Sequence, residues 1–213
     1  MKQIGILGSG TVGQTLAEGF KTHGYAVKIG SRSPDKLAEF SKSSGIEAGT
    51  FLDVASWAEM LVLSVHGSAA QEALTLANHD HLRGKIIIDT TNPIAESPPV
   101  DGVLQFFTGP NESLLEALQL AVPAARFVKA FNSVGASRMV NPGYAGGRPT
   151  MFYCGNDAAA KAEVAKILDQ FGWEAADMGT AVAARAIEPL CQLWCIPGFR
   201  QNSWTHAFKV LWG

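Results

Sequence analysis

Short apolar runs alternate with longer segments of helical period along most of the chain. The runs typical of β-strands are Gln3–Leu7, Ala26–Gly30, Met60–Ser64, Lys85–Asp89, Phe127–Phe131 and Thr150–Cys154, with a weaker one at Glu174–Asp177. Strands separated by helices are joined by crossover connections, which produce a mostly parallel sheet. The pattern therefore predicts an α/β fold in which a doubly wound sheet carries helices on both faces.

The helical segments lie between these runs. In the first, Val12, Leu16 and Phe20 fall on one helical face, and Gly24 follows at the position of a C-terminal cap. Later helices are predicted at Pro34–Ser43, Ser68–Ala77, Ser113–Ala121 and Ala158–Phe171. These segments supply the helices that the two faces of the sheet require.

Two segments fall outside this alternation. The proline-rich stretch Glu96–Asn111 is irregular and fits either a binding loop or a surface excursion. Residues from about 179 to 213 are rich in apolar side chains, which predicts a short helical tail that packs on the sheet or on a second subunit as a homodimer. No linker composition divides the chain, so we expect residues 1–213 to form a single domain.

Composition and charge exclude several classes of protein. Lys and Arg total 17 against 19 Asp and Glu, a net charge of -2, so we expect no binding to nucleic acid or to anionic membranes. No apolar run reaches the roughly 18 residues that span a bilayer. Cys154, Cys191 and Cys195 lack disulfide or zinc spacing, which favours a cytoplasmic protein without a bound metal.

A glycine-rich turn follows the first predicted strand. Gly8-Ser9-Gly10-Thr11-Val12-Gly13 matches G-x-G-x-x-G between a strand and a helix, the context in which this pattern indicates dinucleotide binding rather than an ordinary turn. The first glycine permits the tight turn, the second lets the backbone approach a pyrophosphate, and the third lets the helix lie close to the strand. Backbone N–H groups at the helix start would bind the anion. The sequence thus predicts a Rossmann-type sheet.

The residues after the second predicted strand indicate which dinucleotide binds. An NAD site places Asp or Glu there to accept from the ribose 2′-hydroxyl, whereas this chain continues from Gly30 into Ser31-Arg32-Ser33. These side chains offer donors to a 2′-phosphate, and Arg32 adds a planar, charged fork. Lys36 adds a second charge nearby. We therefore expect NADP(H) to be the cofactor.

Three further segments should meet beyond the carboxyl ends of the strands, where ligands of doubly wound sheets bind. They are Val65-His66-Gly67, Thr90-Thr91-Asn92-Pro93 and Lys129-Ala130-Phe131-Asn132. The expected cofactor contacts among them are Val65, His66, Asn92 and Pro93. The candidate catalytic residues are His66, Lys129 and Asn132. His66 fits a proton donor or a local hydrogen-bonding residue, and Lys129 fits a functional group or a side chain that extends to solvent.

In this order, the motifs resemble the NADP oxidoreductase, coenzyme F420-dependent family, which is related to the oxidoreductase domain of STEAP metalloreductases. The resemblance covers nearly the whole chain and includes Cys154-Gly155-Asn156-Asp157 and Ile187-Glu188-Pro189-Leu190. It implies hydride exchange between NADPH and a small-molecule acceptor, a flavin or deazaflavin. It also places the following residues near the cofactors: Thr11, Val12, Ser31, Arg32, Asn92 and Asn132.

Two other functions stay open from the residues themselves. The lack of a clear acid–base pair also fits a non-catalytic NADP(H)-binding sensor. His66 or Lys129 as proton donor would fit a reductase of small carbonyls or imines. These alternatives differ in whether NADPH is consumed and in what accepts the hydride.

Overall fold

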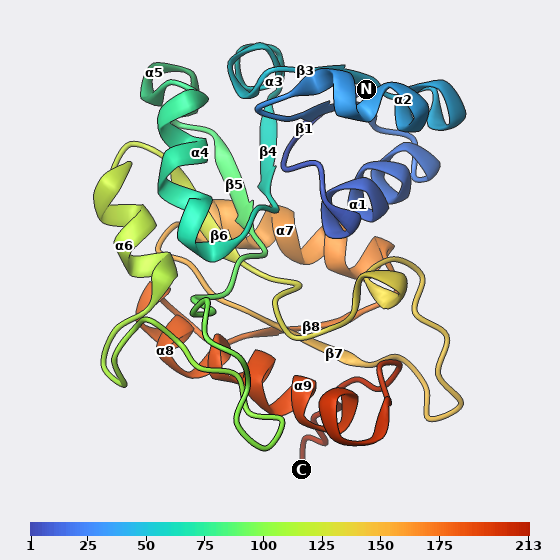
Figure 1. The fold of residues 1–213 in the computed structure, drawn as a ribbon, viewed down its shortest axis with the longest axis vertical. Helices are drawn as coiled ribbons and strands as arrows, with labels where there is room; N and C mark the ends of the chain where they lie inside the picture. Colours follow the sequence, from blue (N-terminus) through green and yellow to red (C-terminus); the bar gives the residue numbers. More distant parts are fainter.

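The computed structural model describes residues 1–213 (Figure 1). Its central sheet has six parallel strands in the order β3-β2-β1-β4-β5-β6. They are β1 (Gln3–Leu7), β2 (Ala26–Gly30), β3 (Glu47–Gly49), β4 (Met60–Leu63), β5 (Ile86–Asp89) and β6 (Arg126–Lys129). The strand order reverses between β1 and β4, which confirms the predicted Rossmann-type α/β fold.

A two-stranded parallel sheet of β7 (Thr150–Tyr153) and β8 (Glu174–Asp177) lies beside the end of β6. One antiparallel bridge, between Lys129 and Cys154, connects the two sheets. In Figure 1 this pair and the C-terminal helices lie at the opposite end of the molecule from β2 and β3. The carboxyl end of β6 therefore joins the central sheet to the C-terminal part of the chain.

Different helices cover the two faces of the central sheet. Their bounds are α1 (Thr11–Thr22), α2 (Ala38–Ser44), α3 (Phe51–Trp57), α4 (Ala70–Leu76), α5 (His79–Leu82), α6 (Leu114–Ala121), α7 (Ala158–Gln170), α8 (Ala184–Ile187) and α9 (Pro189–Gln201). Helices α1 and α7 share one core cluster with Ile4, Ile6 and Val62, and helices α3, α4 and α6 share the other with Leu61 and Leu63. Alternate residues of a strand point to opposite faces, so strands buried on both sides are apolar throughout.

The alternation pattern misses three elements, β3, α3 and the four-residue helix α5. β3 has only three residues, too few to show a period. The start of α3 carries a capping box in which the Thr50 hydroxyl accepts from the Asp53 N–H at 3.1 Å and the Asp53 carboxylate accepts from the Thr50 N–H at 3.0 Å. A T-x-x-D pattern ahead of an apolar run was therefore the available signal.

The C-terminal segment is helical only as far as Gln201. Residues 202–213 form no helix or strand, although the Thr150 N–H of β7 donates to the Phe208 carbonyl at 2.9 Å. Trp194 of α9 is buried, whereas Leu211 and Trp212 are 86% and 73% exposed. The apolar side chains of this segment are thus divided between core and surface.

The irregular stretch that begins at Glu96 lies against α9. Leu104 is buried there in one cluster with Cys191 and Cys195, and its carbonyl accepts from Gln192 Nε2 at 2.8 Å. This stretch is therefore packed on the C-terminal segment over part of its length. None of the helices combines the length and the apolar character that crossing a bilayer requires.

Two glycines of the predicted turn allow close packing of backbone. Gly8 has φ +140°, and a Cβ on it would lie 2.3 Å from the Ser64 carbonyl oxygen. A Cβ on Gly13 would lie 2.1 Å from the Gly8 carbonyl oxygen. Gly13 therefore lets α1 approach the end of β1, as the pattern predicts.

We expect Gly13→Ala to lower the free energy of unfolding by about 1–3 kcal/mol, the usual cost of overpacking, because α1 must move away from the turn. Urea unfolding followed by circular dichroism measures the change. Gly10→Ala is the matched control, since a Cβ there meets nothing within 4 Å, and its cost should stay within about 1 kcal/mol. Equal losses in the two variants would contradict this account of the turn.

Candidate nucleotide-binding site

A cavity of about 1070 Å³ runs along the carboxyl ends of β1, β2, β4 and β5. It lies at the reversal of strand order, where nucleotides bind in this architecture. Bonds between neighbouring strand ends fix its floor: the Ser64 N–H donates to the Leu7 carbonyl at 2.8 Å, and Thr90 Oγ1 donates to the Leu63 carbonyl at 3.0 Å. The predicted residues that line the cavity are Gly8, Ser9, Gly10, Thr11, Val12, Ser31, Arg32, Ser33, Lys36, Val65, His66 and Asn92.

Four predicted residues do not line it, namely Gly13, Pro93, Lys129 and Asn132. Gly13 and Pro93 are buried beside the lining segments. The lining also includes residues that sequence reasoning did not select, among them Phe51 of α3, Glu72 of α4 and Ile94. These three come from elements whose place beside the glycine turn depends on the tertiary fold.

The N-terminus of α1 opens onto the cavity without a cap. Gly10 is the N-cap residue, no side chain caps the helix, and its first turn carries no acidic residue. The first N–H groups of a helix have no partner within it. Gln14 Nε2 donates to the Ser9 carbonyl at 2.8 Å and so braces the turn. An anion with several oxygen atoms would satisfy these donors, and the open space at Gly10 gives it room.

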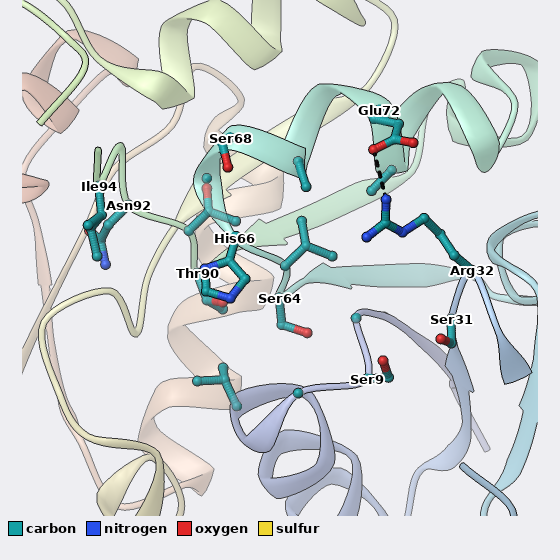
Figure 2. A pocket seen from close by; sticks show the side chains of 18 of the residues that line it. Ser9, Ser31, Arg32, Ser64, His66, Ser68, Glu72, Thr90, Asn92 and Ile94 are labelled. Atoms are coloured by element: carbon teal, nitrogen blue, oxygen red, sulfur yellow. Dashed lines mark hydrogen bonds and ion pairs between the residues drawn. The ribbon is translucent and has the colours of Figure 1, made fainter. Parts of the chain in front are cut away.

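Arg32 and Glu72 face each other at one end of the cavity, as Figure 2 shows. The Arg32 Nη1 atom lies 3.3 Å from Glu72 Oε2, and the two side chains are 63% and 55% exposed. Such an exposed pair contributes about 0–1 kcal/mol and opens readily. No carboxylate directly follows β2, which ends at Gly30, and the two cations Arg32 and Lys36 outnumber the single carboxylate of Glu72 at this end of the cavity.

His66 lies near the middle of the cavity, between Ser64 and Thr90 (Figure 2). Its side chain comes from the loop after β4 and is exposed. A Cβ on the next residue, Gly67, would lie 2.0 Å from the Asn92 carbonyl oxygen. The loops after β4 and β5 are therefore in direct contact, and His66 lies next to that contact in the chain.

Asn92 lies at the end of the cavity opposite Arg32 (Figure 2). Two hydrogen bonds join its side chain to Asn132. Asn92 Nδ2 donates to the Asn132 carbonyl at 2.8 Å, and Asn132 Nδ2 donates to Asn92 Oδ1 at 3.1 Å. Asn132 Nδ2 also donates to the Ile187 carbonyl at 2.9 Å. Asn132 is buried behind the cavity wall, while Asn92 is part of the wall.

Lys129 is wholly buried, with a side-chain exposure of 0%. Its Nζ atom lies 2.6 Å from Asp89 Oδ2 and 2.9 Å from Glu188 Oε1, and it donates to the Thr91 carbonyl at 2.7 Å. Burial lowers the pKa of Lys129, but attraction to Asp89 and Glu188 outweighs that effect and leaves the pKa above its ordinary 10.5. The ammonium is thus enclosed by oxygen atoms, and the alternative that it extends to solvent was wrong.

The two carboxylates around Lys129 have further donors. Asp89 Oδ1 accepts from the Thr91 N–H at 2.9 Å and from Thr91 Oγ1 at 2.7 Å. Glu188 accepts from the N–H groups of Leu114 and Leu115, at 2.9 and 3.0 Å, at the start of α6. Buried charges are tolerated when paired and hydrogen-bonded in this way.

Replacing Lys129 tests how far the stability of the protein depends on its buried ammonium. We expect Lys129→Met to lower the free energy of unfolding by about 3–5 kcal/mol, because two buried carboxylates lose their counter-ion. The folded-state pKa of Lys129 is raised, so its stabilisation is complete below the ordinary value of 10.5 and is lost as the pH rises through the folded-state pKa.

Urea unfolding at a series of pH values tests this prediction. The difference between wild type and Lys129→Met should stay constant in the neutral range and narrow at alkaline pH. Lys166→Met is the control, because the Lys166–Glu163 pair is exposed and contributes about 0–1 kcal/mol. A loss for Lys129→Met as small as that of the control would contradict the assignment.

Comparison with known proteins agrees with this geometry. Residues 3–93 match the family model described as NADP oxidoreductase coenzyme F420-dependent. A solved structure from Arthrobacter sp. FB24, provisionally described as an F420-dependent NADP reductase, has a TM-score of 0.92 and 35% sequence identity and covers 99% of each chain. The chain belongs to this family. The F420-dependent oxidoreductase family uses NADP, and this agrees with the basic end of the cavity.

More distant relatives share part of their length with the chain. Rat metalloreductase STEAP3 is 32% identical over 200 residues, which are 92% of this chain and 38% of STEAP3. The chain therefore spans well under half of that relative. An imine reductase from Myxococcus stipitatus in complex with NADP⁺ has a TM-score of 0.67 at 18% identity, over 91% of this chain and 61% of the reductase, and shares the fold.

Proposed function

We propose that residues 1–213 form one domain that binds NADPH in the cavity and transfers a hydride to a flavin-like or deazaflavin acceptor. The uncapped start of α1, open at Gly10 and next to Arg32 and Lys36, carries the proposal. A pyrophosphate satisfies free N–H groups at a helix start, and basic side chains bind a 2′-phosphate. Membership of an NADP oxidoreductase family supports the same cofactor.

The two ends of the cavity suit the two ends of NADPH. Ser31, Arg32, Ser33 and Lys36 would hold the 2′-phosphate, and the turn Gly8–Gly13 would hold the pyrophosphate. The nicotinamide would then lie toward His66 and Asn92. A doubly charged phosphate binds a guanidinium more strongly than an exposed carboxylate does, so we expect Arg32 to leave Glu72 when NADPH binds.

Bound NADPH supplies a hydride from its nicotinamide ring, and the acceptor takes up that hydride and a proton. The protein contributes position and shelter from water, which is what transfer between two organic cofactors requires. His66 is an exposed titratable side chain beside the proposed nicotinamide position, and we propose that it holds the proton. Asn92, oriented by Asn132, would hydrogen-bond the carboxamide or the ribose.

We expect Arg32→Ala to weaken NADPH binding by about tenfold to a hundredfold, since a hydrogen bond to a charged group contributes about 1.5–3 kcal/mol. NADH lacks the 2′-phosphate, so its affinity should stay nearly unchanged. Glu72→Gln is the complementary variant, because it frees Arg32 of its carboxylate and should tighten NADPH binding. Calorimetric titration of both cofactors measures these changes, and equal losses for NADPH and NADH with Arg32→Ala would contradict the assignment.

Turnover tests the reaction itself. We expect the purified protein to oxidise NADPH when a flavin or deazaflavin acceptor is present, and the decrease in NADPH absorbance measures the rate. His66→Ala should lower this rate more than it lowers the affinity for NADPH. A panel of quinone, ferric, carbonyl and imine acceptors identifies any other substrate class. Tight NADPH binding without turnover on any acceptor would instead favour the sensor.

A further inference from the structure

We propose that the junction between α8 and α9 sets the nicotinamide end of the cavity through two buried links. Lys129 and Asn132 are the positioning residues of these links. The inference rests on the proposed binding of NADPH and concerns how the cavity wall is held. The two links join Ile187 and Glu188, which are consecutive at the junction, to Thr91 and Asn92, which are consecutive in the wall.

The first link is ionic. Glu188 Oε1 holds the Lys129 ammonium at 2.9 Å, and that ammonium donates to the Thr91 carbonyl at 2.7 Å. Asp89 holds the N–H and the hydroxyl of the same Thr91. Donor and acceptor groups of Thr91 are therefore all fixed by buried charges, which prevents its peptide groups from rotating.

The second link is neutral and runs parallel to the first. Asn132 Nδ2 donates both to the Ile187 carbonyl and to Asn92 Oδ1, at 2.9 and 3.1 Å. In turn, Asn92 Nδ2 donates a hydrogen bond to the Asn132 carbonyl. Both hydrogens of the Asn132 amide are thus used, and the Asn92 side chain can take only one orientation toward the cavity.

Two energetically unfavourable features occur at these links. Asn132 Oδ1 is buried without a hydrogen-bond partner, and an unsatisfied buried acceptor is destabilising. Phe131, between the two positioning residues, is buried at φ +63°, a strained backbone conformation for a bulky residue. Such costs persist where the surrounding structure over-determines the conformation, and they concentrate at functional sites.

The adenine end of the cavity does not share these links. Ser31 and Arg32 follow β2, and their hydrogen bonds run to Ser33, Gly49 and Glu72. A disturbance of Lys129 or Asn132 should therefore change the contacts of the nicotinamide half of NADPH and leave those of the adenine half intact. A general loss of stability would affect both halves alike.

The test compares two ligands on the full chain. NADPH occupies both ends of the cavity, whereas adenosine 2′,5′-bisphosphate carries only the adenine end. We expect Asn132→Ala to weaken NADPH about tenfold, which is about 1.4 kcal/mol, and to leave the bisphosphate within about twofold of wild type. Calorimetric titration gives both constants, and circular dichroism confirms the fold.

Glu188→Gln tests the other link with a side chain of the same size that leaves Lys129 paired with Asp89. We expect the same pattern with a smaller loss for NADPH, about threefold. Arg32→Ala is the control at the opposite end of the cavity. It should weaken the binding of both ligands, because both occupy the adenine end.

Three outcomes would overturn the inference. Equal weakening of both ligands by folded Asn132→Ala and Glu188→Gln would mean that their role is general stability. Unchanged binding of both ligands would mean that the links do not set the wall. Failure of the wild type to bind either ligand would instead overturn the proposed NADPH function, and this inference with it.

Discussion

The buried ammonium of Lys129 is the interaction on which the arrangement of the chain depends. A cation removed from water must find oxygen partners, because its desolvation costs several kcal/mol. Here the partners come from the end of β5, from the loop after it and from the start of α9, and Glu188 extends the network to the start of α6. The Lys129 ammonium therefore ties the start of α9 to the carboxyl ends of β5 and β6 in the central sheet.

This constraint also explains where charged groups lie relative to the cavity. The charged groups of Lys129, Asp89 and Glu188 are buried behind the wall at the proposed nicotinamide end, while that part of the wall presents small polar side chains such as Thr90 and Asn92. Arg32, Lys36 and Glu72 carry the exposed charge at the other end, and Glu96, from the loop after Asn92, adds one exposed carboxylate to the lining. In the proposed complex, the oriented dipoles of this wall would face the hydride donor, which suits a reaction that depends on position.

Local chemistry made much of this predictable from the sequence. The glycine turn and Ser31-Arg32-Ser33 lie next to strands that their own apolar residues identify, and all of these residues except Gly13 line the cavity. A lysine at the end of an apolar strand is unusual, and the sequence therefore singles out Lys129. The orientation of its side chain depends on Glu188, which the fold brings from a distant part of the chain. Glu72 was missed for the same reason, since nothing near it in sequence shows that α4 faces Arg32.

The pair of Arg32 and Glu72 has a consequence for small anions. A free phosphate or sulfate ion that approaches the basic end must separate the guanidinium from a carboxylate, and it brings no adenine or ribose to compensate. A whole nucleotide compensates through the rest of its contacts. The carboxylate therefore weakens the binding of a small anion at this end, but only by a few-fold, since an exposed pair of this kind contributes about 0–1 kcal/mol.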